Sequence, residues 1–247
     1  MKKNPLLGVL GGLGPMSTFW FCELLTAHTK AETDADHIDM IISSRATTPD
    51  RTAFILGKSD RDPLPVMLSE AERLRRAGAD LLVIPCNTAH FFYEGLAQNC
   101  DIPILNIVSE TVSFLQKRGV RTFGLLATEG TVSSRSYHRF ATPLGMTCLT
   151  PEPDEQREIT EIIYGEVKQN KPADFSAFLR ISQSLLNRRC EALVLGCTEL
   201  SLLRREGLSQ PWYVDSLEVL AHQTILACGK EPVGFPESFA VLREGKA

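Results

Sequence analysis

The chain has 247 residues, of which 43% are hydrophobic and 23% charged, and its formal net charge is −4. This ordinary globular composition suits one large α/β domain or two small ones. The modest negative charge gives no electrostatic reason to expect a nucleic acid or an anionic membrane as partner. No apolar run approaches the roughly 20 residues of a membrane-spanning helix. We therefore expect a cytoplasmic protein that binds neither nucleic acid nor membrane.

The cysteines are odd in number and form no C-x-x-C pair. This pattern argues against a disulfide framework and against a structural zinc site, so we expect no bound metal. The seven positions are Cys22, Cys86, Cys100, Cys148, Cys190, Cys197 and Cys228.

Short apolar runs alternate with helical patterns in the first half of the chain. In chain order they predict a strand at 6–10, a glycine-rich turn at 11–18, a helix at 19–28, a strand at 38–42, a polar loop at 43–51, a helix at 66–77 and strands at 81–84 and 102–107. Gly78 is placed to cap the helix at 66–77, whose last turn is rich in arginine.

The same alternation starts again in the second half. It predicts strands at 122–126, 193–195 and 213–214, and helices at 133–140, 156–168 and 174–187. Matching positions keep nearly the same spacing, which indicates an internal duplication. The clearest matches are Gly8 with Gly124, Cys86 with Cys197, and Leu105 with Val214.

Continuous apolar strands that alternate with helices are typical of parallel sheets covered on both faces. The duplication therefore predicts an α/β fold of two pseudo-symmetric lobes. We expect residues 1–111 plus 213–247 to form the first lobe and residues 112–212 the second. Ligands of open parallel sheets bind beyond the carboxyl ends of the strands, so two facing lobes would share one cleft.

The most informative repeat is a strand that ends in a cysteine. Residues 80–90 read DLLVIPCNTAH and residues 191–200 read EALVLGCTEL, with Cys86 and Cys197 at equivalent positions. An unperturbed thiol with a pKa of about 8.5 is only about 3% ionised at pH 7. A helix N-terminus and nearby hydrogen-bond donors can lower that pKa, and both cysteines precede helical patterns. Alternatively, a cysteine at such a position can be a small buried hydrophobic residue with no chemical role. We expect this of the remaining five cysteines.

Two equivalent thiols, one from each facing lobe, suit a reaction that takes place on both faces of one substrate carbon atom. In racemisation at a Cα–H bond, a thiolate removes the proton on one face and a thiol supplies a proton on the other. The residues alone therefore predict a cofactor-independent reaction that uses Cys86 and Cys197.

These motifs resemble the paired signatures of the aspartate/glutamate racemase family. The resemblance extends to GGLGPM at 11–16, TPDR at 48–51, LATEGT at 126–131 and YGEVK at 164–168, and so covers nearly the whole chain. It implies a cofactor-independent amino-acid racemase that is a homodimer, with Cys86 and Cys197 as the acid/base pair. Arg51 and Lys168 would then bind the side-chain carboxylate of an acidic substrate. The groups implied to surround its α-carboxylate and amino group are Asn87, Thr88, Thr128, Thr131 and Thr198, with Met16 lining the pocket.

The chain departs from the glutamate branch of that family at two positions. Gly11 stands in place of an aspartate, and Glu199 in place of a histidine after the second cysteine motif. Both changes favour the aspartate branch. Glu199 either assists a thiol or simply stabilises a helix N-terminus. His90 either orients a thiolate or is a packed histidine, and Lys168 is either a ligand or a solvated helix end.

Other functions remain open at this stage. Relatives with the same cysteine pair include broad-specificity amino-acid racemases and isomerases of hydantoins, maleate or arylmalonates. A non-catalytic protein that captures dicarboxylates would also fit the basic groups. The sequence disfavours a dinucleotide site, because Ser17 stands where the third glycine of G-x-G-x-x-G belongs.

Overall fold

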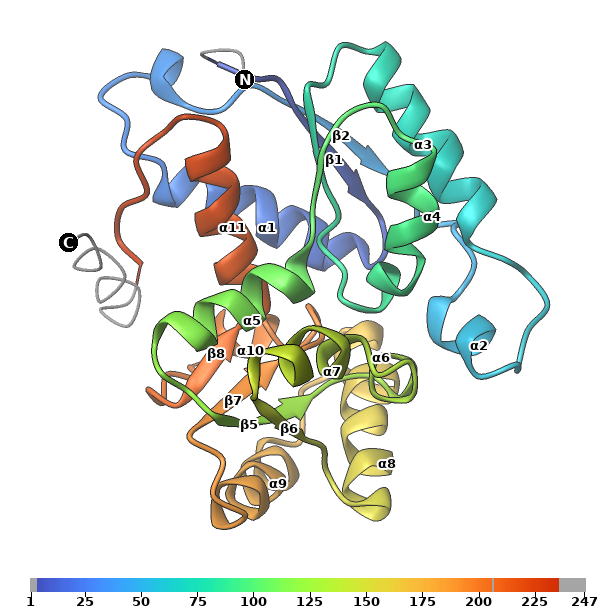
Figure 1. The fold of residues 1–247 in the computed structure, drawn as a ribbon, viewed down its shortest axis with the longest axis vertical. Helices are drawn as coiled ribbons and strands as arrows, with labels where there is room; N and C mark the ends of the chain where they lie inside the picture. The colour runs from blue at the N-terminus through green and yellow to red at the C-terminus, as the bar shows by residue number, and fades with distance from the viewer. Residues whose placement is uncertain (1–3, 206, 236–247) are drawn as a thin grey trace.

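The computed structural model describes residues 4–205 and 207–235 and contains two parallel four-stranded sheets (Figure 1). The first sheet has the order β2-β1-β3-β4, and the second has the matching order β6-β5-β7-β8. The strands are β1 (Leu7–Gly11), β2 (Met40–Ser44), β3 (Leu81–Val83), β4 (Ile104–Leu105), β5 (Thr122–Leu126), β6 (Thr147–Leu149), β7 (Ala192–Leu195) and β8 (Tyr213–Asp215). The predicted two-lobed α/β fold is confirmed.

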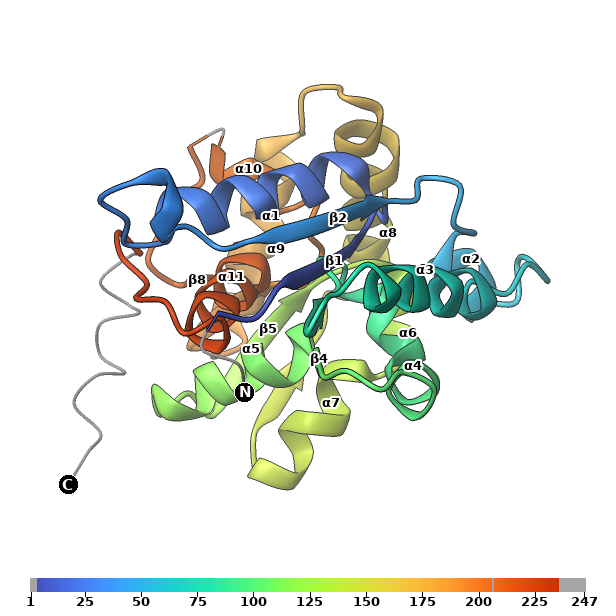
Figure 2. The ribbon, with the colours of Figure 1, turned by 90° about the horizontal axis from the view of Figure 1, so that it is seen from above.

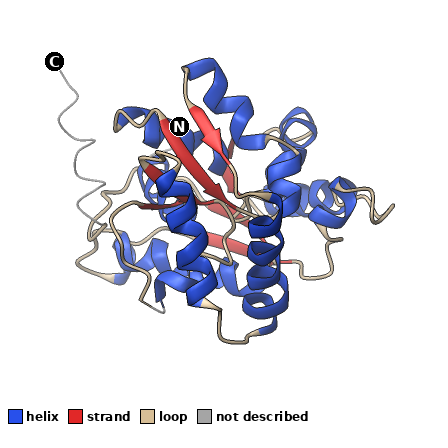
Figure 3. Ribbon diagram, turned by 90° about the horizontal axis from the view of Figure 1, so that it is seen from below, coloured by secondary structure: helices blue, strands red, loops and turns tan. Residues whose placement is uncertain are grey.

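Helices pack around the sheets (Figure 3). The central strands β1, β3, β5 and β7 are almost entirely buried, whereas the edge strands β2 and β6 are partly exposed. The helices are α1 (Pro15–His28), α2 (Arg51–Ile55), α3 (Leu64–Arg76), α4 (Tyr93–Gln98), α5 (Ile107–Lys117), α6 (Glu129–Ser133), α7 (Ser136–Ala141), α8 (Pro153–Glu161), α9 (Phe175–Asn187), α10 (Leu202–Arg205) and α11 (Ser216–Ala227). Gly78 follows α3 with φ of +102°, as expected of a residue that ends a helix. Within the described ranges no helix is long and apolar enough to cross a membrane.

The internal repeat extends to the register of the strands. Gly8 in β1 is paired with Leu82 of β3, and Gly124 in β5 with Leu193 of β7. A Cβ atom added to Gly8 would lie 2.5 Å from Leu82 Cδ2, and one added to Gly124 would lie 2.6 Å from Leu193 Cδ2. Both glycines therefore make room for a leucine on the neighbouring strand.

Replacing either glycine by alanine is expected to destabilise the protein by about 1–3 kcal/mol, because the added methyl group overpacks a filled core. Thermal or urea unfolding measures the change. The two substitutions should cost similar amounts, and Gln98→Ala on the exposed end of α4 serves as the control. Gly8→Ala and Gly124→Ala variants as stable as that control would contradict the predicted close packing.

A shared core joins the lobes. Alternate residues of β1 and β5, such as Leu7 and Phe123, point into one apolar cluster that also contains residues of α1, α5 and α11. Leu10 packs instead in a cluster with α3 and α4, and Leu126 in one with α8 and α9. Figures 1 and 2 show α5 and α11 between the two sheets. The lobes are therefore held in a fixed relation at the base of the cleft.

The boundary near residue 213 differs in detail from the prediction. β8 pairs in parallel with β7, so the second sheet extends to Asp215 rather than ending at residue 212. The following helix α11 packs against both α1 and α5. The last part of the predicted first lobe, 236–247, lies outside the described residues.

Three elements of the second lobe differ from the sequence interpretation. The single helix expected at 133–140 is instead the two short helices α6 and α7, separated by Arg135 in a left-handed conformation. β6 was not predicted, because its three residues are too short and too exposed at Thr147 to form an apolar run. The single helix expected at 156–168 is instead α8 followed by a π-helical turn at Ile162–Glu166 and a 3₁₀ turn at Val167–Gln169. Such irregular turns often occur at functional sites, and this one carries Lys168.

Candidate active site

Cys86 and Cys197 follow the carboxyl ends of the equivalent strands β3 and β7 and line one small cavity. Both thiols are buried. The cavity has a volume of about 10 Å³, which is close to the minimum for one water molecule. The structure thus brings the two predicted catalytic sulfur atoms, one from each lobe, to the same enclosed space.

Most of the other predicted site residues line the same cavity. These are Arg51, Asn87, Thr88, Thr128, Lys168 and Thr198. Thr131 lies behind them, in contact with the hydroxyl groups of Thr88 and Thr128. Met16 is 51% exposed and lines a larger neighbouring cleft of about 480 Å³. The cavity and the cleft share walls, including Arg51 and Lys168.

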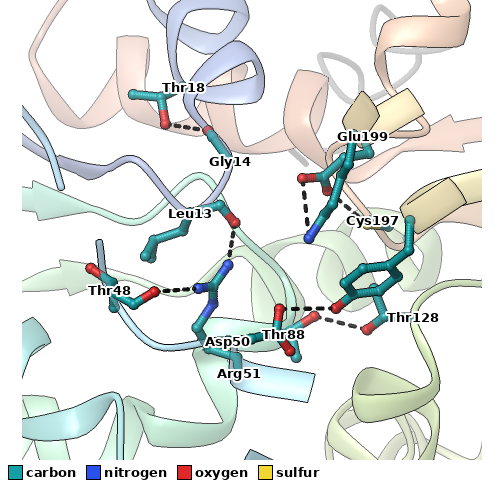
Figure 4. A network of polar contacts seen from close by, with 12 residues as sticks. Leu13, Gly14, Thr18, Thr48, Asp50, Arg51, Thr88, Thr128, Cys197 and Glu199 are labelled. Carbon is teal, nitrogen blue, oxygen red and sulfur yellow. Dashed lines mark hydrogen bonds and ion pairs between the residues drawn. The ribbon is translucent and has the colours of Figure 1, made fainter. Parts of the chain in front are cut away.

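The Arg51 guanidinium is buried and held by the backbone. Its Nη2 donates to the Leu13 carbonyl at 2.7 Å, and its Nη1 donates to the Thr48 carbonyl at 3.3 Å (Figure 4). Nη1 also donates to the Pro49 carbonyl at 2.9 Å. Its Nε has no hydrogen-bond partner among the described residues, and no described carboxylate forms an ion pair with it. Asp50 caps α2 and so fixes the first turn that carries this side chain. The result is a rigid cation suited to binding a carboxylate.

Lys168 provides a second cation. Its Nζ lies 3.8 Å from Glu199 Oε1 and 4.1 Å from the centroid of the Tyr164 ring. Burial is the largest single influence and acts to lower the pKa of Lys168, but the charges of Glu199, Tyr164 and Cys197 together outweigh it and raise that pKa above its ordinary value. Lys168 is therefore a charged group that faces the site rather than a solvated helix end. The sequence motif at 164–168 contains Tyr164 but did not indicate a role for it. Its position one helical turn before Lys168 is the feature that could have predicted contact between the two side chains.

Three threonine hydroxyl groups form a buried triangle between the lobes. Thr88 Oγ1 lies 2.9 Å from both Thr128 Oγ1 and Thr131 Oγ1, which are 3.1 Å apart. Thr128 also caps α6, so the triangle is tied to the start of a helix. The hydroxyl group of Thr198 is buried and has no hydrogen-bond partner among the described residues. It is thus a donor and acceptor that remains for a ligand.

Asn87 connects the two cysteine loops. Its Oδ1 accepts a 2.6 Å hydrogen bond from the Tyr137 hydroxyl, and its Nδ2 donates to Ser216 Oγ at 2.9 Å. Ser216 in turn donates to the carbonyl of Leu195, at the end of the strand that leads to Cys197. The side chain predicted to bind substrate therefore also links the lobes beneath the cavity. No local sequence pattern pointed to Tyr137 or Ser216 as part of the site.

His90 supports the Cys86 loop through the backbone. Its Nδ1 lies 2.8 Å from the Cys86 carbonyl oxygen, and its Nε2 accepts from the Ile107 N–H at 3.3 Å. This pattern assigns the proton to Nδ1. Burial lowers the pKa of His90 to about 4, so the ring is neutral at physiological pH. His90 is thus a packed histidine and not a group that orients a thiolate.

The predicted helix N-termini beside the thiols are not formed. Cys86 precedes a 3₁₀ turn at Thr88–Phe92, and α10 begins only at Leu202, five residues after Cys197. Burial raises the pKa of both thiols, and the charge of Glu199 raises that of Cys197 further. The expectation that helix ends lower both pKa values is therefore wrong for this structure, because burial is the largest influence.

Glu199 contacts the second thiol directly. Cys197 Sγ donates to Glu199 Oε2 at 2.9 Å, and Glu199 is only 5% exposed (Figure 4). Its Oε1 has no hydrogen-bond partner among the described residues. The alternative that Glu199 assists a thiol therefore agrees with the geometry better than a role at the N-terminus of a helix.

The site as a whole combines acid/base groups with unpartnered polar atoms. Buried polar groups in native proteins are nearly always hydrogen-bonded. Here the atoms without a partner among the described residues converge on one cavity: Arg51 Nε, Thr52 Oγ1, Thr198 Oγ1 and Glu199 Oε1. These atoms are suited to a small polar ligand that carries a carboxylate, with a thiol from each lobe beside it. Because the cavity itself has a volume of only about 10 Å³, such a ligand would extend into the adjoining cleft of about 480 Å³.

Comparisons with known proteins agree with this chemistry. The model of the Asp/Glu/hydantoin racemase family matches residues 10–224. The broad-specificity amino-acid racemase RacX of Bacillus subtilis is 26% identical over 227 residues, which cover 89% of this chain and 96% of that protein.

Solved structures share the fold. The aspartate racemase of Picrophilus torridus superposes with a TM-score of 0.79 at 27% identity, covering 96% of this chain and 99% of that one. The glutamate racemase of Francisella tularensis, solved with D-glutamate, superposes with a TM-score of 0.62 at 17% identity, covering 97% and 92% of the two chains. The second of these likenesses concerns the fold alone.

Proposed function

Because the chain belongs to the Asp/Glu/hydantoin racemase family, we propose that it interconverts the enantiomers of an acidic amino acid, with aspartate preferred over glutamate. The family likeness makes the protein an isomerase. The observation that carries the substrate and the mechanism is the single cavity lined by Cys86, Cys197 and two cationic side chains.

The proposed mechanism uses one thiol on each face of Cα. A thiolate removes the α-proton, and the opposite thiol gives its proton to the other face of the carbanion. In the reverse direction the two sulfur atoms exchange roles. The proton count is unchanged by turnover, and the proposal includes no cofactor and no metal.

The preference for an acidic substrate rests on Arg51 and Lys168. Both are buried or partly buried cations at the boundary between the cavity and the larger cleft. A substrate with its Cα between the thiols would direct its side-chain carboxylate toward them. The carboxylate would bind the guanidinium, whose Nε is unpartnered among the described residues.

A broad-specificity amino-acid racemase is the second candidate. Besides the likeness to RacX, it is favoured by the apolar groups Met16, Val167 and Leu202 in the wall of the larger cleft. Such a surface would accept neutral side chains that an Arg–Lys pair does not select. A panel of amino acids separates the two candidates.

Incubation with L-aspartate in deuterated buffer, without any cofactor, is the test of the proposal. We expect deuterium at Cα and the appearance of D-aspartate in chiral chromatography, because the proton added to the second face comes from a solvent-exchanged thiol. Faster turnover of neutral amino acids would favour the broad-specificity candidate. Binding of aspartate without any α-hydrogen exchange would instead identify a non-catalytic dicarboxylate-binding protein and overturn the proposal.

We also propose a cytoplasmic homodimer, which rests on the family resemblance and the composition. Light scattering of the full chain tests the assembly: a mass near twice the 27.3 kDa of one chain is expected.

A further inference from the structure

The two thiols have different surroundings although their strands are equivalent. Cys197 Sγ donates to the Glu199 carboxylate at 2.9 Å. Among the described residues Cys86 has no carboxylate at hydrogen-bond distance. Burial raises the pKa of both thiols, the charge of Glu199 also raises both, and Lys168 lowers both. The differences are that the Arg51 guanidinium lowers the pKa of Cys86, whereas Cys197 donates a hydrogen bond to the Glu199 carboxylate. The internal symmetry of the fold therefore does not extend to the chemistry of the sulfur atoms.

Glu199 is held where it contacts Cys197. Lys168 Nζ lies 3.8 Å from its Oε1, whereas the thiol contact is made at Oε2. Gly14 leaves space for it, since a Cβ atom at that position would lie 2.8 Å from Oε1. A carboxylate held in this way accepts a hydrogen bond only from the protonated sulfur, and its charge opposes ionisation of that sulfur.

We propose that Glu199 fixes the protonation of the thiol pair, so that Cys197 is held as the thiol and Cys86 is the first to ionise. This inference rests on the proposed racemase function and adds the order in which the two thiols ionise. The resting enzyme then accepts the enantiomer whose α-hydrogen faces Cys86. Cys86 takes that proton as the Cα–H bond breaks, and Cys197 gives its own proton to the opposite face as the new Cα–H bond forms.

Turnover leaves the two sulfur atoms in the opposite state. Cys86 is then the thiol and Cys197 the thiolate, close to the Glu199 carboxylate. The resting state returns when Cys86 releases one proton to solvent and Cys197 takes one from solvent, so that no net proton is consumed. Repulsion between the Cys197 thiolate and Glu199 favours this return.

The test is a titration of the protein labelled with carbon-13 at the cysteine Cβ atoms, since the Cβ chemical shift distinguishes a thiol from a thiolate. Cys86→Ala and Cys197→Ala variants assign the two signals. In the wild-type protein we expect Cys86 to ionise at lower pH than Cys197. In Glu199→Gln the thiolate population of Cys197 should rise about 10- to 100-fold at a given pH, because a charged hydrogen bond and a like charge are both removed.

Matched variants control the experiment. Glutamine has the shape of glutamate and fits beside Gly14, whereas Glu94→Gln removes an equivalent charge from an exposed position on α4 and should leave the Cys197 titration unchanged. Gly14→Ala displaces the Glu199 carboxylate without changing its charge. Gly14→Ala should therefore move the Cys197 titration in the same direction as Glu199→Gln does. If Glu199→Gln does not fold, the titration of Gly14→Ala decides whether Glu199 controls the ionisation of Cys197.

The possible outcomes separate this inference from the proposed function. If Cys197 ionises before or together with Cys86, or if its titration does not move in Glu199→Gln, the inference is overturned even when the wild-type protein racemises aspartate. If the wild-type protein racemises no amino acid, the proposed function fails, while the order of titration still decides the role of Glu199.

Discussion

Cys86→Ala and Cys197→Ala should each lower the rate of aspartate racemisation by at least about 1000-fold. General acid–base groups contribute roughly 10²- to 10⁴-fold each, and here both are needed in every turnover. Because the two thiols act as a unit, the double variant should racemise aspartate at nearly the same rate as each single variant. Chiral chromatography measures the rate, and any α-hydrogen exchange that survives in a single variant should occur with one enantiomer only.

The control for this prediction is another buried cysteine of the same strand region. Cys190 lies just before β7, at the end opposite Cys197, and does not line the cavity. Cys190→Ala should keep nearly full activity although it also removes a buried sulfur. Full activity in both Cys86→Ala and Cys197→Ala would rule out the two-thiol mechanism.

The strands that carry the site could be predicted because parallel strands covered on both faces are continuous apolar runs. Such runs precede both Cys86 and Cys197, and their repetition located the two residues and the cleft. β6 could not be found in this way, since only Cys148 of its three residues is buried.

The contacts within the site depend on turns and on long-range packing, which the local pattern does not determine. Glu199 is two residues beyond Cys197, a spacing at which side chains on a regular helix do not meet. Here the chain turns after the cysteine, with the Leu200 N–H donating to the Cys197 carbonyl, and this brings Glu199 back to the sulfur. The link from Asn87 to Ser216 joins residues that are far apart in the chain.

Neither thiol lies at the N-terminus of a regular helix, although the sequence pattern predicted one beside each. A helix N-terminus lowers a thiol pKa only where a regular helix begins beside the sulfur. The sequence after each cysteine suggested such a helix, whereas the structure has a 3₁₀ turn in one lobe and an irregular turn in the other. The apolar runs did indicate that both cysteines are buried. Burial is the largest influence on the pKa of each thiol and raises both values.

Arg51→Lys should lower kcat/KM for aspartate at least about 100-fold. A lysine keeps the positive charge but cannot present the planar fork that binds a carboxylate through two hydrogen bonds. Each hydrogen bond to a charged group is worth about 1.5–3 kcal/mol, so that the loss of two amounts to about 3 kcal/mol or more, and each 1.4 kcal/mol is tenfold. Steady-state kinetics with aspartate and with a neutral amino acid, on the same preparation, measure the effect.

The comparison of substrates distinguishes recognition from general damage. Arg51 also donates to the carbonyls of Leu13, Pro49 and Thr48, so its replacement disturbs the loop as well as the site. Such damage would slow acidic and neutral substrates alike, whereas loss of the carboxylate contact slows only the acidic ones. A drop confined to acidic substrates, with thermal unfolding little changed, is therefore the expected result. An equal drop for both classes would assign Arg51 to the loop and leave the preference for aspartate to Lys168.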